Sequence, residues 1–377
     1  MTDSVQGALA RLEPFAAGVI AQQANNIDGS AVFPTHTVDA LRQANLLGLI
    51  TPTEHGGLGG TIFDAARVVE RIAQECGTSA MVACMHYAGA AVLAAYGSAE
   101  ANAEVARGEH LSTLAFSESG SRSHFWAPVS TAKRSEGDTV TLDARKSWVT
   151  SASHAHAYIW SSQSLDDPAA STIWLVQRGQ EGLSIAGGFD GLGLRGNDST
   201  PVSAEGVRIP AANQLGPDGG GFDVMMGTVL PAFQLMNAAC SIGLMEGALR
   251  GAISHVSATR LEHMGASLRE LPTLRSYLAQ ARIQADSARA LWLDTMAAAG
   301  SNRPDTMLRI LQVKAAANEA ALDVTATCMR VCGGAAYRKD LGVDRYFRDA
   351  QAGAVMAPTS DVLYDFVGKA ICGMELF

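Results

Sequence analysis

The period of the hydrophobic pattern changes twice along this chain, and that change limits the folds it can adopt. From residue 1 to about 110 the apolar residues recur at helical spacing, whereas from about 111 to 221 they alternate at the two-residue spacing of strands. Helical spacing returns from 222 to 377. Because each region must bury its own apolar face, we expect a helical domain at 1–110, a β-barrel at 111–221 and a helical bundle at 222–377.

Local signals place elements inside these regions. Helices are expected at 65–76 and 79–96, and the second is apolar on every face, which predicts that it is buried. A turn at 136–138 precedes an alternating strand. Further short strands are expected at 158–160, 172–176 and 207–209. In the last region, Gly333 and Gly334 end a long helix.

Charge and cysteine content exclude several classes of protein. The net charge of −9 argues against a nucleic-acid partner, which needs a concentrated basic surface. The longest apolar stretches, such as 88–96, are too short to span a bilayer, and the N-terminus lacks the features of a signal peptide. We therefore expect a cytoplasmic protein without a membrane partner. Cys328 and Cys332 have helical spacing but no second pair or nearby histidine, so the six cysteines are expected to be buried thiols and no metal site is expected.

Five motifs occur in a fixed order along the chain. They are 114–123 (LAFSESGSRS), 146–151 (KSWVTS), 191–200 (GLGLRGNDST), 330–337 (RVCGGAAY) and 346–361 (YFRDAQAGAVMAPTSD). Their order and spacing resemble those of the acyl-CoA dehydrogenase superfamily over essentially the whole chain. The resemblance implies an α+β architecture with an N-terminal helical domain, a central β-barrel and a C-terminal four-helix bundle. It also implies a homodimer or homotetramer that binds FAD.

The resemblance further assigns residues to the flavin. Trp148 and Thr150 would lie against the isoalloxazine, Ser117 would contact its pyrimidine edge, and Ser123 would approach the pyrophosphate together with neighbouring amides. Thr359 would also lie near the flavin. In the family a neighbouring subunit completes the FAD site, and the matching positions in this chain are Arg260, Arg330, Gly333 and Gly334.

The resemblance breaks down at the catalytic base. In the family a glutamate of the last motif usually removes the substrate α-proton, and Ala357 occupies that position here. Other members carry the glutamate on the first long helix of the bundle, where Phe233 is the matching residue. The family's Asp-x-x-Arg contact to the thioester cofactor corresponds to Pro231 and Gln234. The carboxylates that remain as candidate bases are Glu118, Glu246 and Asp361.

The missing base favours a reduced-flavin monooxygenase of a small, aromatic or nitrogen-containing substrate. Such a site needs a closed apolar pocket and one or two hydrogen-bonding groups, and Ser121, His124 and His86 are the candidates. The cofactor would be FAD, or FADH2 supplied by a partner reductase. An acyl-CoA or acyl-carrier dehydrogenase with a displaced base is the alternative. A structural or nucleic-acid-protecting flavoprotein is a third hypothesis, which the acidic charge opposes.

Overall fold

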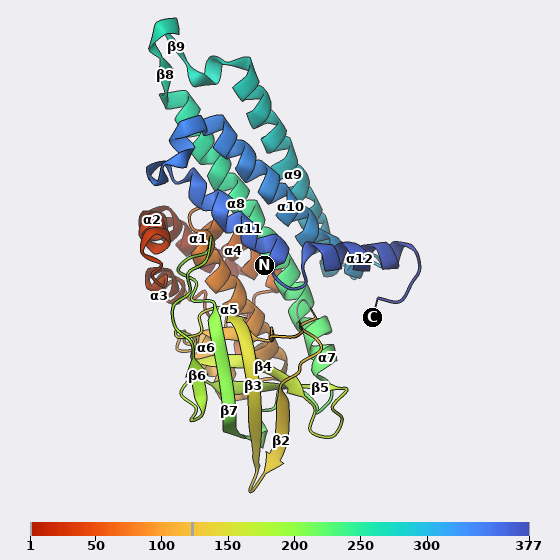
Figure 1. Cartoon of the computed structure of the whole chain (residues 1–377). Coiled ribbons are helices and arrows are strands. Elements are labelled where there is room, and N and C mark those ends of the chain that lie inside the picture. Colours follow the sequence, from red (N-terminus) through yellow and green to blue (C-terminus); the bar gives the residue numbers. More distant parts are fainter. Residues whose placement is uncertain (1, 122–123, 377) are drawn as a thin grey trace.

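The computed structural model describes residues 2–121 and 124–376, which form an elongated molecule with a β-rich end and a long helical end (Figure 1). The first helices are α1 (Asp3–Phe15), α2 (Ala21–Ser30), α3 (Thr35–Gln43), α4 (Ile62–Ala73), α5 (Gly77–Tyr96) and α6 (Ala99–Ala106). The strands of the middle region are β1 (Ser112–Ala115), β2 (Thr131–Ser135), β3 (Thr139–Val149), β4 (Ala157–Gln163), β5 (Ser171–Gln177), β6 (Leu183–Ile185) and β7 (Thr200–Pro210).

The last part is helical again. Its helices are α7 (Gly221–Val224), α8 (Leu230–Ala258), α9 (Pro272–Gly300), α10 (Thr306–Cys332), α11 (Val343–Val355) and α12 (Ser360–Ile371), and the hairpin of β8 (Arg260–Leu261) and β9 (Ala266–Ser267) joins α8 to α9. This helix–sheet–helix order confirms the predicted fold class. The hairpin lies at the end of the molecule farthest from the β-rich end (Figure 1).

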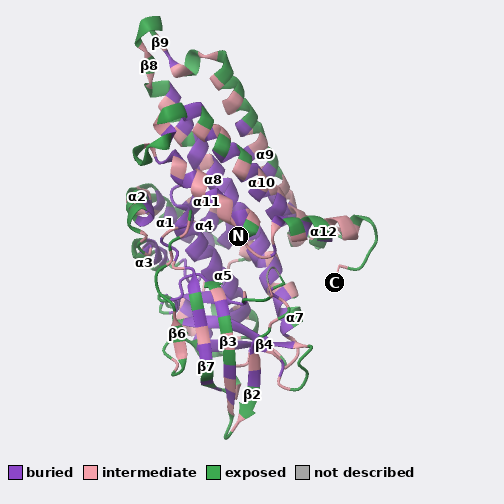
Figure 2. Cartoon of the chain, in the orientation of Figure 1, coloured by how far each residue is buried: buried purple, intermediate pink, exposed green. Residues whose placement is uncertain are grey.

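Helix α5 packs against α4, α8 and β1, and it is buried along nearly its whole length (Figure 2). Its apolar residues on all faces explain this position, as predicted. Helix α4 begins at a capping box in which Thr61 and Asp64 satisfy each other's backbone amides, and its buried face packs against α8. The N-terminal region is therefore held to the C-terminal bundle by apolar packing.

Two findings correct the expectations from composition. The segments Gly77–Tyr96 and Gly221–Ala258 are long and apolar enough to cross a bilayer by length and composition alone, although we expected no such stretch. In each, 89% of the most apolar window is buried inside the fold, which is typical of a helix in a protein core. Five of the cysteines are buried as predicted, but Cys372 is exposed because it follows the end of α12.

The middle region consists of two sheets that face each other across a core containing Tyr158, Trp160 and Trp174. Their strand orders are β1-β4-β5 and β2-β3-β7-β6. The predicted strands at 158–160, 172–176 and 207–209 are confirmed within β4, β5 and β7. Strand β2 was not predicted, because it is half-exposed and Ala132 is its only buried residue. This β-rich end carries one wall of the site.

The bundle carries the other wall. Helix α8 begins beside the β-rich end, and α11 runs back toward that end after α9 and α10 have covered the bundle (Figure 1). The end of α11 and the start of α12 therefore come close to the start of α8. Helix α12 projects sideways from the bundle (Figure 1).

Candidate active site

A cavity of about 920 Å³ lies where the β-rich region meets the bundle. Its described lining comes from β1 and the loop after it, the end of β3, the loop at 189–199, the start of α8 and the end of α11. Ligand pockets typically measure roughly 300–1,000 Å³, so this cavity can accommodate a flavin ring together with a small substrate. Most of the exposed surface within it is apolar.

An exposed indole forms part of the barrel-side wall. Lys146 pairs with Val202 and Val149 with Thr200, so strand β3 holds one residue more than its partner between these pairs. Such a β-bulge re-aims a side chain. Trp148 lies in the bulge with a left-handed φ of 56° and is 68% exposed, which is unusual for a large aromatic residue at the end of a strand. The bulge therefore presents a flat apolar face to the cavity.

Hydroxyl groups line the same wall. Thr150 lies in the cavity lining with its Oγ1 2.9 Å from the Oγ of Ser199, while its carbonyl accepts a hydrogen bond from Thr113. Ser117 also lines the cavity, and its carbonyl accepts from the Ser147 amide at 2.9 Å. These contacts hold the loop after β1 against β3. The predicted flavin residues Ser117, Trp148 and Thr150 therefore meet in one wall.

A buried ion pair supports this wall from behind. The Lys146 ammonium donates to the Glu118 carboxylate and to the Ser161 carbonyl, and neither side chain of the pair is more than 1% exposed. Glu118 also accepts from the amides of Val129 and Ser130. Burial by itself would raise the pKa of Glu118, but the Lys146 charge and the hydrogen bonds from Lys146, Ser130 and the Val129 amide together outweigh burial and lower that pKa. Burial lowers the pKa of Lys146 to about 8, against the opposing effect of Glu118.

This ion pair makes Glu118 unavailable as the catalytic base. Glu118 is the one acidic residue in the described lining of the cavity, and its carboxylate is fully engaged by an ammonium, two amides and the Ser130 hydroxyl. A carboxylate with a lowered pKa and this many donors is a weak proton acceptor. Glu246 forms ion pairs with Arg282 and Arg289 on α9, and Asp361 is exposed outside the lining. None of the three is placed to act as a base.

The opposite wall, formed by α8 and the segment after α11, has no acidic side chain in its described lining that could act as a base. Phe233 and Leu230 of α8 line the cavity with Met356 and Ala357, which follow α11. Thr359, predicted to lie near the flavin, lines it too and caps the start of α12 through its hydroxyl. Gln234 differs from expectation: it is completely buried, lies outside the described lining, and neither of its amide atoms has a partner.

One cation reaches the described lining, but it is already paired. Arg348 donates to both oxygens of Asp28 at 2.6 Å and to Asp344 at 2.9 Å. Burial by itself would raise the pKa of Asp28, but hydrogen bonding to Arg348 and its charge outweigh burial and lower it. The described lining therefore holds no unpaired charge with which to grip an anionic cofactor arm.

Two of the proposed catalytic residues lie beside the cavity rather than in it. Ser121 donates to the Glu118 carbonyl at 3.3 Å, and His124 is exposed with its ring edge-on to Trp126. Neither belongs to the described lining, although Phe125 does. Ser123, the predicted pyrophosphate contact, lies outside the described residues.

His86 is a core residue. Its Nδ1 accepts from the Ser112 amide at 3.1 Å and its Nε2 lies 2.9 Å from the Leu47 carbonyl. Since Nδ1 is an acceptor, Nε2 carries the proton of the neutral ring. Burial lowers the pKa of His86 to about 4, so the ring stays neutral at pH 7. With both nitrogens engaged and no place in the cavity lining, His86 holds α5 to β1 and is not a candidate catalytic group.

The residues expected from a neighbouring subunit lie far from the cavity of their own chain. Arg260 is exposed in the β8–β9 hairpin at the distal end of the bundle (Figure 1). Arg330 is exposed near the end of α10, where it stacks on Tyr277, and Gly333 and Gly334 follow it. One chain therefore does not bring the two sets of predicted flavin residues together.

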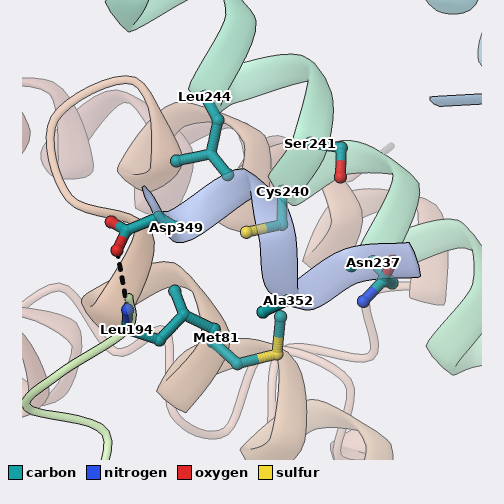
Figure 3. A pocket seen from close by; sticks show the side chains of 9 residues that line it. Met81, Leu194, Asn237, Cys240, Ser241, Leu244, Asp349 and Ala352 are labelled. Atoms are coloured by element: carbon teal, nitrogen blue, oxygen red, sulfur yellow. Dashed lines mark hydrogen bonds between the residues drawn. The ribbon is translucent and has the colours of Figure 1, made fainter. Parts of the chain in front are cut away.

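A second, much smaller cavity lies between α5, α8 and α11 (Figure 3), and Leu194 and Ala352 line both cavities. Its volume of about 10 Å³ suits one water molecule. Asp349 lines it and accepts from the Leu194 amide at 2.7 Å, while its other oxygen has no partner. Burial raises the pKa of Asp349 to about 6. This void is too small for a substrate, and Asp349 serves to hold the 189–199 loop to α11.

The described residues fit a flavin better than a metal. Among residues 2–121 and 124–376 there is no group of three histidine, cysteine or acidic side chains that could hold a metal ion. An exposed indole, hydroxyl groups and an apolar cavity match what an isoalloxazine ring needs. Ser117, Trp148, Thr150 and Thr359 would hold it in this chain.

Comparison with known proteins decides the family. Models of the acyl-CoA dehydrogenase N-terminal, middle and C-terminal domains match residues 2–108, 113–207 and 219–372. The chain belongs to the acyl-CoA dehydrogenase superfamily. It is accordingly a flavin-dependent oxidoreductase. It is 28% identical over 359 residues to the probable acyl-CoA dehydrogenase YngJ of Bacillus subtilis, covering 93% of each protein.

Solved structures of the superfamily have the same fold. Butyryl-CoA dehydrogenase from Megasphaera elsdenii matches with a TM-score of 0.92 over 99% of both chains, at 21% identity. FMN-bound TdsC from Paenibacillus sp. A11-2 matches with a TM-score of 0.86 over 99% of this chain and 98% of that one, at 20% identity. At these identities the likeness shows the fold alone.

The sequence motifs missed three long-range interactions at or beside the site. These are the ion pair of Glu118 with Lys146, the ion pair of Arg348 with Asp28, and the hydrogen bonds from the buried Lys314 ammonium to carbonyls of the segment at 353–358. Each joins residues that are at least 28 positions apart, so no local spacing marks the pair. A lysine inside an apolar helical stretch was the one signal that could have drawn attention to Lys314.

Proposed function

We propose that this superfamily member is a reduced-flavin monooxygenase that inserts one oxygen atom into a small, apolar, aromatic or nitrogen-containing substrate. The observation that carries the proposal is the absence of an available carboxylate in the described cavity lining. Ala357 and Phe233 occupy the wall, and Glu118 is held by Lys146. Removal of a substrate α-proton needs a positioned base, whose loss lowers the rate by about 10²–10⁴.

The character of the cavity supports the same proposal. Its described walls are mainly aromatic and aliphatic, and its one cation, Arg348, is engaged by Asp28 and Asp344. A CoA arm carries several phosphate charges that such a lining does not match. TdsC, which shares this fold, has been crystallised with FMN and indole together. A planar apolar substrate of that size would suit the Trp148 side of the cavity.

The chemistry divides between cofactor and protein. When bound, reduced flavin supplies two electrons to O₂, so that one oxygen atom enters the substrate and the other leaves as water. Trp148 would pack on the ring system, and the hydroxyls of Ser117 and Thr150 would orient its polar edge. Phe233, Phe116 and Leu114 would keep water away from the reacting atoms.

We further propose that the cofactor is FAD and that the site is completed in a homodimer or homotetramer. Arg260, Arg330, Gly333 and Gly334 are exposed at the distal end of the bundle, where they are free to meet a second copy. A separate reductase would supply the reduced flavin. Ser121 and His124, which flank the cavity, would be the nearest hydrogen-bonding groups on that side for the substrate.

Isotopic labelling tests the proposed activity. Enzyme reconstituted with FAD is reduced chemically, then mixed with ¹⁸O₂ and a panel of small aromatic and nitrogen-containing compounds that includes indole. We expect a product that contains one ¹⁸O atom. Oxidation of the flavin with formation of hydrogen peroxide alone, for every compound of the panel, would contradict the proposal.

The alternative is an acyl-CoA or acyl-carrier dehydrogenase with a displaced base, which the match to all three acyl-CoA dehydrogenase domain models favours. The same preparation, oxidised and anaerobic, is mixed with acyl-CoAs of increasing chain length. Bleaching of the flavin by any of them would favour the dehydrogenase. We expect no bleaching.

A further inference from the structure

Lys314 is a lysine whose side chain is entirely buried in the middle of α10. Among the described residues no carboxylate lies within ion-pairing distance of its ammonium, in contrast to Lys146 with Glu118. Burying an ammonium is unfavourable by several kcal/mol unless other groups replace its water. Other polar groups must therefore take the place of water around the Lys314 ammonium.

They are three backbone carbonyls of one short segment. The Nζ atom lies 2.9 Å from the carbonyl oxygen of Gly353, 3.0 Å from that of Met356 and 2.9 Å from that of Pro358. An ammonium has three N–H donors, and each finds one acceptor. The Gly353 carbonyl lies in the last turn of α11 and Met356 caps that helix, and a positive charge at this end is favoured by the helix dipole.

The same segment forms part of the wall of the large cavity. It joins the end of α11 to the start of α12, and Met356, Ala357 and Thr359 of this junction line the cavity. Gly353 is packed so closely on α10 that a Cβ there would come within 2.5 Å of the Asn318 side chain. The position of the wall is therefore set by its contacts with α10, and the Lys314 ammonium makes three of them.

We propose that Lys314 is a positioning residue: its buried ammonium fixes the 353–358 segment and thereby sets the shape of the reaction cavity on the side of Ala357. The inference uses the proposed function only in taking the large cavity as the reaction site. It holds for an oxygenase and for a dehydrogenase alike. Apolar packing could stabilise α10 equally well, but only a donor group can satisfy three converging carbonyls.

The test compares Lys314→Met with the wild type as full-length, FAD-reconstituted enzyme. Visible circular dichroism of the bound flavin reports the shape of the site, and perturbation of the flavin absorbance by added indole gives the affinity for a planar probe. We expect the variant to retain bound flavin, to show an altered dichroism spectrum, and to bind indole at least 10-fold more weakly. Lys369→Met on α12 is the matched control, because Lys369 bonds Leu376 and Asp365 rather than the 353–358 segment.

Chemical rescue separates positioning from general stability. Lys314→Ala leaves room for a small cation, so ethylammonium added at high concentration should restore the dichroism spectrum and most of the indole affinity, whereas the bulkier tetramethylammonium, which has no N–H donor, should not. If Lys314→Met fails to fold, Lys314→Ala prepared with ethylammonium takes its place. A wild-type spectrum and affinity in Lys314→Met, or a defect in Lys314→Ala that ethylammonium does not relieve, overturns the proposal.

The two proposals fail separately. Absence of ¹⁸O from every product would sink the oxygenase, while the dichroism comparison, which needs only bound flavin, would still decide the role of Lys314.

Discussion

At the scale of single residues, the proposed reaction turns on the side chain of Ala357. Ala357 lies in the cavity wall between Met356 and Pro358 in the chain, so this part of the wall carries a methyl group and no carboxylate. Its neighbours in the lining, such as Phe233, are apolar and offer no partner for a negative charge. A charge placed there would be desolvated without compensation.

We therefore expect Ala357→Glu to lower the rate of substrate oxygenation by at least about 10-fold, because an ionised carboxylate in this wall repels electron-rich groups and draws in water. The rate of ¹⁸O product formation measures the effect, with bound flavin quantified by absorbance. Ala357→Gln is the control of similar size without charge, and it should lose less. Undiminished oxygenation in Ala357→Glu would show that the wall is remote from the chemistry.

Lys314 predicts a pH dependence at the same scale. Burial lowers its pKa to about 7, and interactions with two titratable groups, Cys84 of α5 and Glu319 of α10, oppose that shift. Burial also raises the pKa of Cys84, so the thiol stays neutral at pH 7. Below about pH 7 the ammonium donates three hydrogen bonds, and above it the amine donates only two.

Indole affinity should therefore decline as the pH rises through about 7 in the wild type, and this step should be absent from Lys314→Met. Perturbation of the flavin absorbance by added indole, followed between pH 6 and pH 9 on enzyme that keeps its flavin throughout, measures the affinity. The same step in both proteins would assign the titration to another group.

At the scale of elements, the Lys146–Glu118 pair connects the loop after β1 to strands β3 and β4. Lys146 reaches the Ser161 carbonyl on β4 and the carboxylate of Glu118 in the loop. Lys146→Met would leave the Glu118 charge buried without its partner, which typically lowers the free energy of unfolding by about 3–5 kcal/mol.

Urea denaturation measures this loss. Lys133→Met, an exposed lysine on β2, is the control and should change stability by less than about 0.5 kcal/mol. The double variant Lys146→Met/Glu118→Gln should recover part of the loss, because it removes both charges. If the single and double variants are equally unstable, the ion pair is not the cause.

At the scale of the whole molecule, the two sets of predicted flavin residues lie at different ends of one chain. Trp148 lines the cavity beside the β-rich end, while Arg330 is exposed toward the other end of the bundle. If a second copy supplies Arg330 to the cavity, Trp148→Ala and Arg330→Ala should each weaken flavin binding in a homogeneous preparation.

Co-expression of the two variants should then restore some intact sites, because a mixed assembly pairs an unaltered Trp148 with an unaltered Arg330 from its neighbour. Flavin bound per chain, measured after purification of the mixed assembly with two different affinity tags, reports the recovery. Binding no better than in either parent variant would mean that both residues act within one chain, or that Arg330 does not contact flavin.

The fold was predictable to a large extent because its signals are local. Residues 79–96 lack a polar face, and α5 is buried as this predicts. The alternation in 140–144 and the turn before it predicted strand β3, which pairs with β2 in a hairpin. Strand β2 itself escaped prediction, because a half-exposed edge strand needs no alternating apolar residues. The burial of α5 and of the 221–258 segment also explains why sequences of membrane-spanning length occur here.

The candidate site was predictable only in part. The sequence by itself determined the order of the motifs, placed an indole at position 148 and a hydroxyl at position 150, and left no carboxylate at position 357, since each depends on the residue type at one position. Only the tertiary structure decided which of these groups are available. It engages Glu118 with Lys146, buries His86 between Leu47 and Ser112, leaves Gln234 outside the lining, and directs the Lys314 ammonium to the wall that carries Ala357. The physical reason is that availability depends on contacts between residues far apart in the chain, and such contacts leave no period or spacing in the sequence.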